Sequence, residues 1–353
     1  MSTPAPLAPG PLDVVGDVHG EIGALRDLLR QLGYRADGSH PGHRHLVFVG
    51  DLCDRGPDSP GVIRLVADLV AHGHASCLLG NHELNILREA PKPANGWFFP
   101  ADHDRAAGRF LACRPASVEE RPRILAFFAT LPVALERADL RVVHAAWHAP
   151  SLAELDRLLP ARDVLDVYRD HAQASERWAS GAGVRDLAGA EYRQWGRHLT
   201  DEAVRVPLLR GIAAMDQQFQ MSNPVRVPTS GVERIADEPF YASGKWRMVD
   251  RVPWWDDYRD EVPVIFGHYW RWSRPTGAAR YSRGERDLFA GIAHDEWLGP
   301  RRSAFCVDYS VGVRYRERGH PLPGGRYEGR LAAVRWPERE LVYDDGERTM
   351  LRG

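Results

Sequence analysis

Short apolar runs alternate with stretches of helical spacing along the first quarter of the chain. Residues 12–15, 46–49 and 76–79 are mostly apolar, and a glycine follows each run. Runs of this kind are typical of buried strands that lead into tight loops. Between them, residues 21–32 and 60–72 carry apolar side chains three and four positions apart, as amphipathic helices do. The pattern predicts a β-α-β-α-β unit whose right-handed crossovers make the three strands parallel neighbours.

A block of polar residues follows each predicted strand. The blocks are Gly16-Asp17-Val18-His19-Gly20, Gly50-Asp51-Leu52-Cys53-Asp54-Arg55-Gly56 and Gly80-Asn81-His82-Glu83. Open α/β sheets keep their chemistry at the carboxyl ends of the strands, so we expect these side chains to gather at one edge. A plain sheet edge with solvated loops would explain any one block alone, but it explains three blocks in order poorly.

The residue types in these blocks suit metal ions and phosphate. Crowded carboxylates raise each other's pKa values unless a cation lies among them. Aspartate and neutral histidine are good ligands for borderline divalent metals, and asparagine adds a carbonyl oxygen. An aspartate between two ions can bridge them at about 3.5–4 Å, the spacing of two-metal phosphoester sites. Arg55 adds a planar fork that matches phosphate oxygens.

The hydrophobic pattern and the composition of the sequence change after residue 150. Helical spacing fills residues 151–220, whereas residues 222–258 are rich in proline, tryptophan and arginine. We interpret 151–258 as a largely helical and irregular insert or cap within a single domain that spans 11–353. Further strands are predicted by short apolar runs at 140–143, 262–266, 305–310, 331–335 and 340–343.

Composition sets a few more bounds. The 353 residues carry a net charge of −2, and without a basic tail or stripe they give no strong argument for nucleic-acid binding. No apolar run reaches the roughly 18 residues of a membrane span, and the N-terminus lacks the layout of a signal peptide. The four cysteines show no paired spacing, which favours reduced thiols. We therefore expect a cytoplasmic protein with a phosphorylated substrate and no membrane partner.

The three blocks resemble the motifs of the calcineurin-like metallophosphoesterases. More narrowly, they resemble the PPP-type phosphatases and their bacterial relatives, which include serine/threonine phosphatases, diadenosine tetraphosphatases and the phosphatase domain of polynucleotide kinase-phosphatase. The resemblance covers residues 12–144 and 262–343. It implies an α/β fold of the α+β type, with two mixed β-sheets in a sandwich flanked by helices, and leaves the insert unmatched.

The resemblance also implies the chemistry of the site. Two divalent metal ions, manganese or alternatively iron or zinc, would be held by Asp17, His19, Asp51, Asn81, His144 and His268. Asp51 would bridge the ions, and a hydroxide between them would attack a phosphomonoester in line. Arg55 and Asn81 would bind the phosphate. His82, oriented by Asp54, would protonate the leaving oxygen.

Some positions depart from the family pattern. Alanines follow His144 where the family usually has a glycine, and Asp308-Tyr309-Ser310 replaces the usual Asp-Thr-Gly. Trp270 stands where many phosphodiesterases of the superfamily carry a second histidine, which favours the PPP-like branch. The second phosphate-binding arginine of PPP-type phosphatases has no assigned counterpart. Glu83 is expected to be structural and to anchor Arg55.

Three functions stay open. The first is hydrolysis of a phosphomonoester on a phosphoprotein or a small molecule. The second is hydrolysis of diadenosine tetraphosphate, although symmetric diadenosine hydrolases typically lack the aspartate found here at Asp54 and carry aspartate in place of Glu83. These two residues therefore favour monoesters. The third is a non-catalytic regulatory protein on the same fold, since a fold alone does not fix function.

Overall fold

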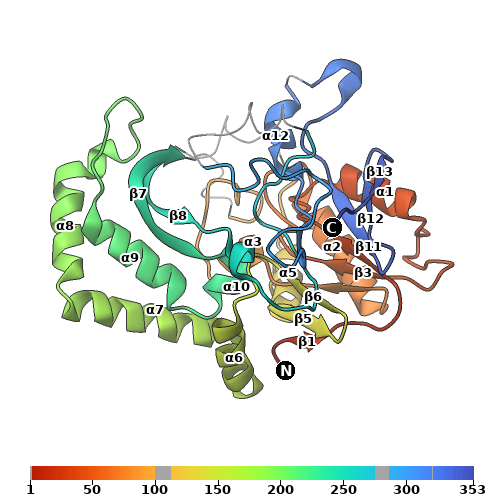
Figure 1. Cartoon of the computed structure of the whole chain (residues 1–353), viewed down its shortest axis with the longest axis horizontal. Coiled ribbons are helices and arrows are strands. Elements are labelled where there is room, and N and C mark those ends of the chain that lie inside the picture. Colours follow the sequence, from red (N-terminus) through yellow and green to blue (C-terminus); the bar gives the residue numbers. More distant parts are fainter. Residues whose placement is uncertain (1, 100–112, 243, 275–285, 320) are drawn as a thin grey trace.

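Two β-sheets form the centre of the molecule in this computed structural model (Figure 1). The structure describes residues 2–99, 113–242, 244–274, 286–319 and 321–353. One apolar cluster holds buried residues of both sheets, among them Val14 and Val47 of one and Val142 and Ile265 of the other. The sheets therefore pack face to face, and the sandwich implied by the resemblance is confirmed.

The first sheet has six strands in the order β13-β12-β11-β2-β3-β4. Its parallel half consists of β2 (Leu12–Val15), β3 (His45–Phe48) and β4 (Ala75–Cys77). Its antiparallel half consists of β11 (Ala332–Trp336), β12 (Glu340–Tyr343) and β13 (Arg348–Met350). The helices α1 (Ile22–Leu32) and α2 (Ser59–Ala71) connect the parallel strands and pack on the outer face. The predicted β-α-β-α-β unit is confirmed.

The second sheet has five strands in the order β1-β5-β6-β9-β10. They are β1 (Ala5–Pro6), β5 (Ala134–Arg137), β6 (Leu140–Val143), β9 (Val264–Phe266) and β10 (Ala304–Cys306). Because β6, β9 and β10 are parallel, their carboxyl ends meet at one edge. Two further helices, α3 (Asn81–Leu87) and α5 (Glu120–Phe128), follow β4 along the chain.

Local chemistry explains where the first helices begin and end. Gly33 takes a left-handed conformation at φ 94° just after α1, and its N–H bonds to the carbonyls of Leu29 and Arg30. Glycine adopts this conformation without the steric penalty of a side chain. Asp58 caps α2 by accepting the N–H of Gly61 at 2.8 Å.

The segment 151–258 projects to one side of the sandwich (green to teal in Figure 1). Its regular elements, with the helix leading into it, are α6 (Ala149–Leu158), α7 (Val164–Gly181), α8 (Val184–Trp195), α9 (Arg210–Met221), α10 (Arg226–Ser230), β7 (Glu233–Ala242) and β8 (Lys245–Arg251). The expectation of irregular structure over 222–258 is wrong across the antiparallel hairpin β7–β8. Alternate hairpin residues pack on the helices, and Met248 lies in a small core with Val206 and Ile212.

Shorter helical turns complete the fold. They are η2 (Leu159–Ala161), η3 (Gly196–His198), η4 (Trp254–Asp257), η5 (Val311–Val313), α12 (Arg314–Glu317) and η6 (Pro323–Gly325). Across the ranges that the structure describes, no helix is both long and apolar enough to cross a membrane.

Candidate metal centre

The loops at the carboxyl ends of four strands deliver the predicted ligands to one place. Asp17 and His19 follow β2, Asp51 follows β3, His144 follows β6 and His268 follows β9. Asn81 opens α3. Both sheets of the sandwich therefore contribute, which is why segments far apart in sequence converge.

Several of these loop residues have a left-handed backbone, which is uncommon for residues other than glycine. They are His19 (φ 47°), Asp51 (φ 48°), Asp54 (φ 74°), Arg55 (φ 69°) and His268 (φ 72°). Each such conformation costs on the order of 1–3 kcal/mol unless the surroundings enforce it, and such residues cluster at functional sites. The strain is concentrated where the sequence predicts chemistry.

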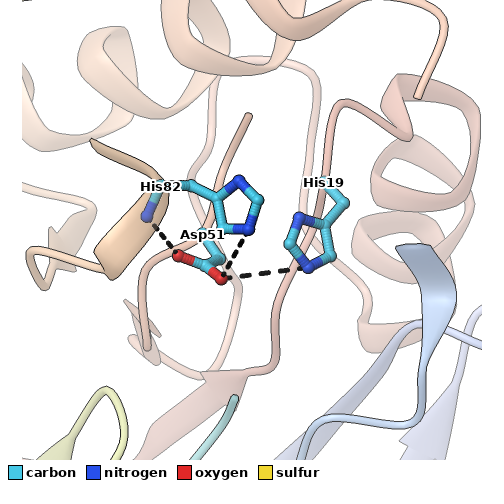
Figure 2. A group of neighbouring side chains, drawn as sticks. All are labelled: His19, Asp51 and His82. Carbon is cyan, nitrogen blue, oxygen red and sulfur yellow. Dashed lines mark hydrogen bonds and ion pairs between the residues drawn. The ribbon is translucent and has the colours of Figure 1, made fainter. Parts of the chain in front are cut away.

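Asp51 lies between two groups of potential ligand atoms. In one group it lies with His19 and His82, in the other with His144 and His268, and within each group the atoms are all within 4.8 Å of one another. Figure 2 shows the first group, in which the Asp51 Oδ2 atom is 3.9 Å from His19 Nε2 and 3.7 Å from His82 Nε2. The Oδ1 atom is 3.4 Å from His144 Nε2. This is the arrangement expected of a carboxylate shared by two ions.

Asp17 and Asn81 complete the set. Asp17 Oδ2 lies 3.9 Å from His19 Nε2, and both Asp17 oxygens accept the backbone N–H of His268 at 3.2 Å. Asn81 Oδ1 lies 3.2 Å from His144 Nε2. All six predicted ligands are therefore brought together.

The electrostatics of the site favour a bound cation. Burial, followed by the nearby carboxylates of Asp308 and Asp51, raises the pKa of Asp17 well above its usual value. Burial also lowers the pKa of His19 and of His268. Neutral imidazoles and ionised carboxylates are the forms that bind metals. The Nε2 atom of His268 is buried with no hydrogen-bond partner among the described residues, a condition that a metal ion would relieve.

Main-chain carbonyls orient two of the histidines. His144 Nδ1 lies 2.9 Å from the Val49 carbonyl oxygen, and His19 Nδ1 lies 3.1 Å from that of Cys53. An N–H donated at Nδ1 leaves Nε2 available as a ligand atom. Sequence reasoning missed these contacts because a backbone carbonyl carries no residue signature.

The His82 ring is held by Asp54, the residue that the resemblance implies as its partner. His82 Nδ1 is hydrogen-bonded to Asp54, which is fully buried and also accepts Asn95 Nδ2 and Trp97 Nε1, each at 2.5 Å. Burial alone would raise the pKa of Asp54, but His82 and these hydrogen bonds hold it below its usual value. Sequence reasoning missed Asn95 and Trp97, which lie in a loop without periodic spacing.

Arg55 points into the same space. Its Nη1 atom is 2.7 Å from His19 Nε2, and its Nη2 atom is 3.3 Å from His82 Nε2. Its guanidinium carbon lies 4.7 Å from the centroid of the Trp270 ring. The guanidinium therefore lies beside the group of His19, Asp51 and His82, in an orientation that suits a phosphate oxygen bound there.

Glu83 is structural, but not in the manner expected. Its carboxylate accepts the backbone N–H groups of Asp51 at 2.9 Å, Leu52 at 2.8 Å and Gly80 at 3.0 Å. None of these contacts is to Arg55, so the expected anchoring of Arg55 is wrong. Glu83 instead ties the loop after β3 to the start of α3, which fixes Asp51.

The positions that depart from the family pattern are accommodated locally. Ala145 donates its N–H to the Pro228 carbonyl at 2.8 Å, so the segment after His144 is held by α10. Asp308 accepts the N–H groups of Trp270 at 2.9 Å and Ser310 at 2.8 Å. Ser310 has a φ of 60°, a conformation for which glycine is the usual residue.

Known proteins are similar to this chain in sequence. Residues 10–205 match the family described as calcineurin-like phosphoesterases. The symmetrical bis(5'-nucleosyl)-tetraphosphatase of Methylococcus capsulatus is 27% identical over 270 residues, which cover 72% of this chain and 80% of that protein. The asymmetrical bis(5'-nucleosyl)-tetraphosphatase PrpE of Oceanobacillus iheyensis is 47% identical over 80 residues, which cover 22% of this chain. The chain spans about a third of the length of this relative, 32%.

Two solved structures match this chain over most of its length. One described as a putative diadenosine tetraphosphatase has a TM-score of 0.42 and 20% identity over 96% of this chain and 95% of that one. The cold-active protein-tyrosine phosphatase of a Shewanella species has a TM-score of 0.45 and 15% identity over 98% of this chain and 82% of that one. Because the family match covers more than half of the sequence, the chain belongs to the calcineurin-like phosphoesterase family.

Proposed function

We propose that the protein is a dinuclear metal-dependent hydrolase that cleaves a phosphoester or phosphoanhydride bond of a phosphorylated substrate. The observation that carries the proposal is the position of Asp51, whose carboxylate is shared by two groups of potential ligand atoms. Asp17, His19 and Asp51 would hold one ion, and His82, which lies beside Asp51 in the same group, would serve as the proton donor instead of a ligand. Asp51, Asn81, His144 and His268 would hold the other. The mixture of imidazole and oxygen ligands suits manganese, and it also suits iron or zinc.

The residues around the ligands have separate tasks in this proposal. Bound divalent ions supply Lewis acidity and lower the pKa of coordinated water. Arg55 pairs with the phosphate oxygens, on which negative charge accumulates during transfer, and the Asn81 amide binds beside it. His82 carries a proton at Nε2 to the leaving oxygen, while Asp54 holds the ring and stabilises its charged form.

The His82–Asp54 pair favours a phosphomonoester as the substrate. An alkoxide leaving from an ester is a strong base and needs a proton, so a positioned acid accelerates its departure. A phosphate leaving from an anhydride is a much weaker base and gains less. A phosphoprotein or a small phosphomonoester therefore fits this feature of the site best.

The relatives named bis(5'-nucleosyl)-tetraphosphatases favour a second candidate, hydrolysis of a dinucleoside tetraphosphate. The same ligands and the same arginine serve this reaction, since it also transfers a phosphoryl group to water. A non-catalytic role for the fold finds no support in the site, because no expected ligand is missing.

A substrate panel tests the proposal. The protein is stripped of metal with a chelator and then reloaded with Mn²⁺. It is assayed with p-nitrophenyl phosphate, a phosphopeptide and diadenosine tetraphosphate, and the products are separated by chromatography. We expect metal-dependent turnover that Asp51→Asn abolishes. Faster turnover of the monoesters supports the first candidate, and faster turnover of the dinucleotide supports the second. Turnover of none of them, or turnover that persists without metal, contradicts the proposal.

A further inference from the structure

The segment 308–318 brings a glycine against the candidate metal centre. After β10 the chain turns at Ser310 and enters the helical turn η5, in the middle of which Gly312 lies buried. A methyl group on Gly312 would lie 2.6 Å from His19 Cδ2 and 2.8 Å from Arg55 Nη1. Carbon atoms in contact normally lie about 3.5–4.0 Å apart. The backbone therefore approaches these two side chains more closely than any residue with a Cβ atom could.

Space, and not backbone conformation, is what this position demands. The left-handed conformation in this stretch belongs to Ser310, at φ 60°, whereas Gly312 has an ordinary negative φ that alanine adopts freely. Ser310 stands where the family pattern has a glycine, and its hydroxyl donates to the Arg271 carbonyl at 3.1 Å. In this segment the glycine that contacts the candidate metal centre is therefore two residues further on, at Gly312.

The segment is held on both sides of Gly312, so it cannot retreat from an added side chain. Val311 is only 1% exposed and packs in the apolar core. Arg314 donates to the buried carboxylate of Asp344 at 2.7 Å. Arg318 pairs with Glu21, which directly follows the first motif block. These contacts fasten the segment to the first sheet and to the loop that carries two of the predicted ligands.

Of the two side chains that face Gly312, Arg55 is the one free to move. The His19 ring is 1% exposed, and its Nδ1 atom lies 3.1 Å from the Cys53 carbonyl oxygen. Its Nε2 atom lies 3.9 Å from a carboxylate oxygen of Asp17 and of Asp51. Arg55 is partly exposed and ends in a guanidinium on a long stem with several rotatable bonds. A methyl group at position 312 would therefore displace the guanidinium.

We propose that Gly312 is a positioning residue for phosphate recognition. Its missing side chain leaves the space in which the Arg55 guanidinium lies 2.7 Å from His19 Nε2 and 3.3 Å from His82 Nε2. The inference rests on the proposed function, because that function assigns Arg55 to the substrate phosphate. A guanidinium binds phosphate through two parallel hydrogen bonds of fixed geometry. Displacement of the guanidinium by a methyl group is enough to break this pairing.

Binding of inorganic phosphate tests the inference without turnover. Phosphate is titrated calorimetrically into the full chain loaded with Mn²⁺. We expect Gly312→Ala to weaken phosphate binding about 10- to 100-fold, the cost of a lost charge-assisted hydrogen bond, with unchanged metal content. The matched control is Gly319→Ala, just beyond the segment, where a methyl group meets nothing within 4 Å. Equal phosphate affinities in the wild type and Gly312→Ala overturn the inference, as does a wild type that binds no phosphate.

A double variant shows whether Gly312 acts through Arg55. Residues that act together give non-additive losses. We expect Gly312→Ala to cost less than about twofold in phosphate affinity when Arg55→Ala is already present. Equal costs with and without Arg55, or a loss of Mn²⁺ in both backgrounds, overturn the inference, because the glycine would then serve His19 or the fold. If Gly312→Ala alone does not fold, the double variant decides. Mn²⁺ binding like that of Arg55→Ala supports the inference, and its loss overturns it.

Kinetics separate this inference from the proposed function. With p-nitrophenyl phosphate and Mn²⁺, we expect Gly312→Ala to lower kcat/KM as Arg55→Ala does, and Gly319→Ala to leave it unchanged. An active wild type and an equally active Gly312→Ala overturn the inference while leaving the proposed function intact. If the wild type hydrolyses no substrate of the panel, the proposed function fails, and the phosphate titration still decides whether Gly312 positions Arg55.

Discussion

The guanidinium carbon of Arg55 lies 4.7 Å from the centroid of the Trp270 ring, so the face of the indole covers the cation. Asp308 holds the loop that carries Trp270 by accepting its backbone N–H at 2.9 Å. A cation over an indole face is attracted by the negative face of the ring. Trp270 therefore orients the Arg55 guanidinium toward the space beside His19 and His82.

Removal of the Trp270 indole should leave the Arg55 guanidinium less firmly positioned. We expect Trp270→Ala to lower kcat/KM on p-nitrophenyl phosphate by about 3- to 30-fold, the equivalent of a partly desolvated cation–π contact. Trp270→Phe keeps an aromatic face and should lose less. Steady-state kinetics with Mn²⁺ measure both variants. An alanine variant as active as the wild type would contradict the positioning of Arg55 by Trp270.

The leaving group tests the role of the His82–Asp54 pair. Asp54→Asn removes the charge that stabilises protonated His82, and we expect kcat on an alkyl phosphate to fall about 10²- to 10⁴-fold. The loss on p-nitrophenyl phosphate should be much smaller, because p-nitrophenolate leaves without a proton. Metal content serves as the control for an intact site. Equal losses on both esters would speak against an acid at this position.

Gly267 tests how tightly the ligands are packed. A methyl group on Gly267 would lie 2.1 Å from Asp17 Oδ1 and 2.8 Å from Val49 Cγ2, so Asp17 must move. We expect Gly267→Ala to weaken metal binding by about 10- to 100-fold, as loss of support around a ligand typically does. Gly319→Ala, which meets nothing within 4 Å, is the matched control. Dialysis followed by elemental analysis compares them, and equal metal contents would refute the packing argument.

A buried carboxylate away from the site supports the first sheet. Asp13 is fully buried and accepts hydrogen bonds from Tyr34 at 2.8 Å, Arg44 at 3.0 Å and Arg335 at 3.2 Å. Asp13→Ala leaves these donors without their shared acceptor, so we expect the free energy of unfolding to fall by about 3–5 kcal/mol. Asp27→Ala, which removes only an exposed pair with Arg30, should cost about 1 kcal/mol or less. Urea denaturation measures both, and similar values would contradict the prediction.

The elements closest to the site could be predicted from the sequence because each leaves a local pattern. The strands before Gly16, Gly50 and Gly80 are short apolar runs, and the helices between them have a clear period. Motif blocks at strand ends then located the candidate ligands, since the carboxyl ends of parallel strands share an edge. His144 and His268 also follow strands, of the second sheet, but their role as ligands was predicted from the family resemblance and not from a local pattern.

What escaped prediction depends on contacts between distant segments. The hairpin β7–β8 contains Pro239 and an irregular register between Ile235 and Phe240, so its alternation is broken in β7. Asn95 and Trp97 support Asp54 from a loop with no period, and Glu83 binds backbone groups that any residue would supply.

Metal stoichiometry tests the central claim most directly. The full chain is loaded with Mn²⁺, dialysed to remove loosely held ions, and analysed for metal per chain. We predict two equivalents for the wild type and a clear loss for Asp51→Asn, because Asp51 belongs to both ligand groups. Less than one equivalent bound to the wild type, or unchanged binding in the variant, would contradict the two-ion site.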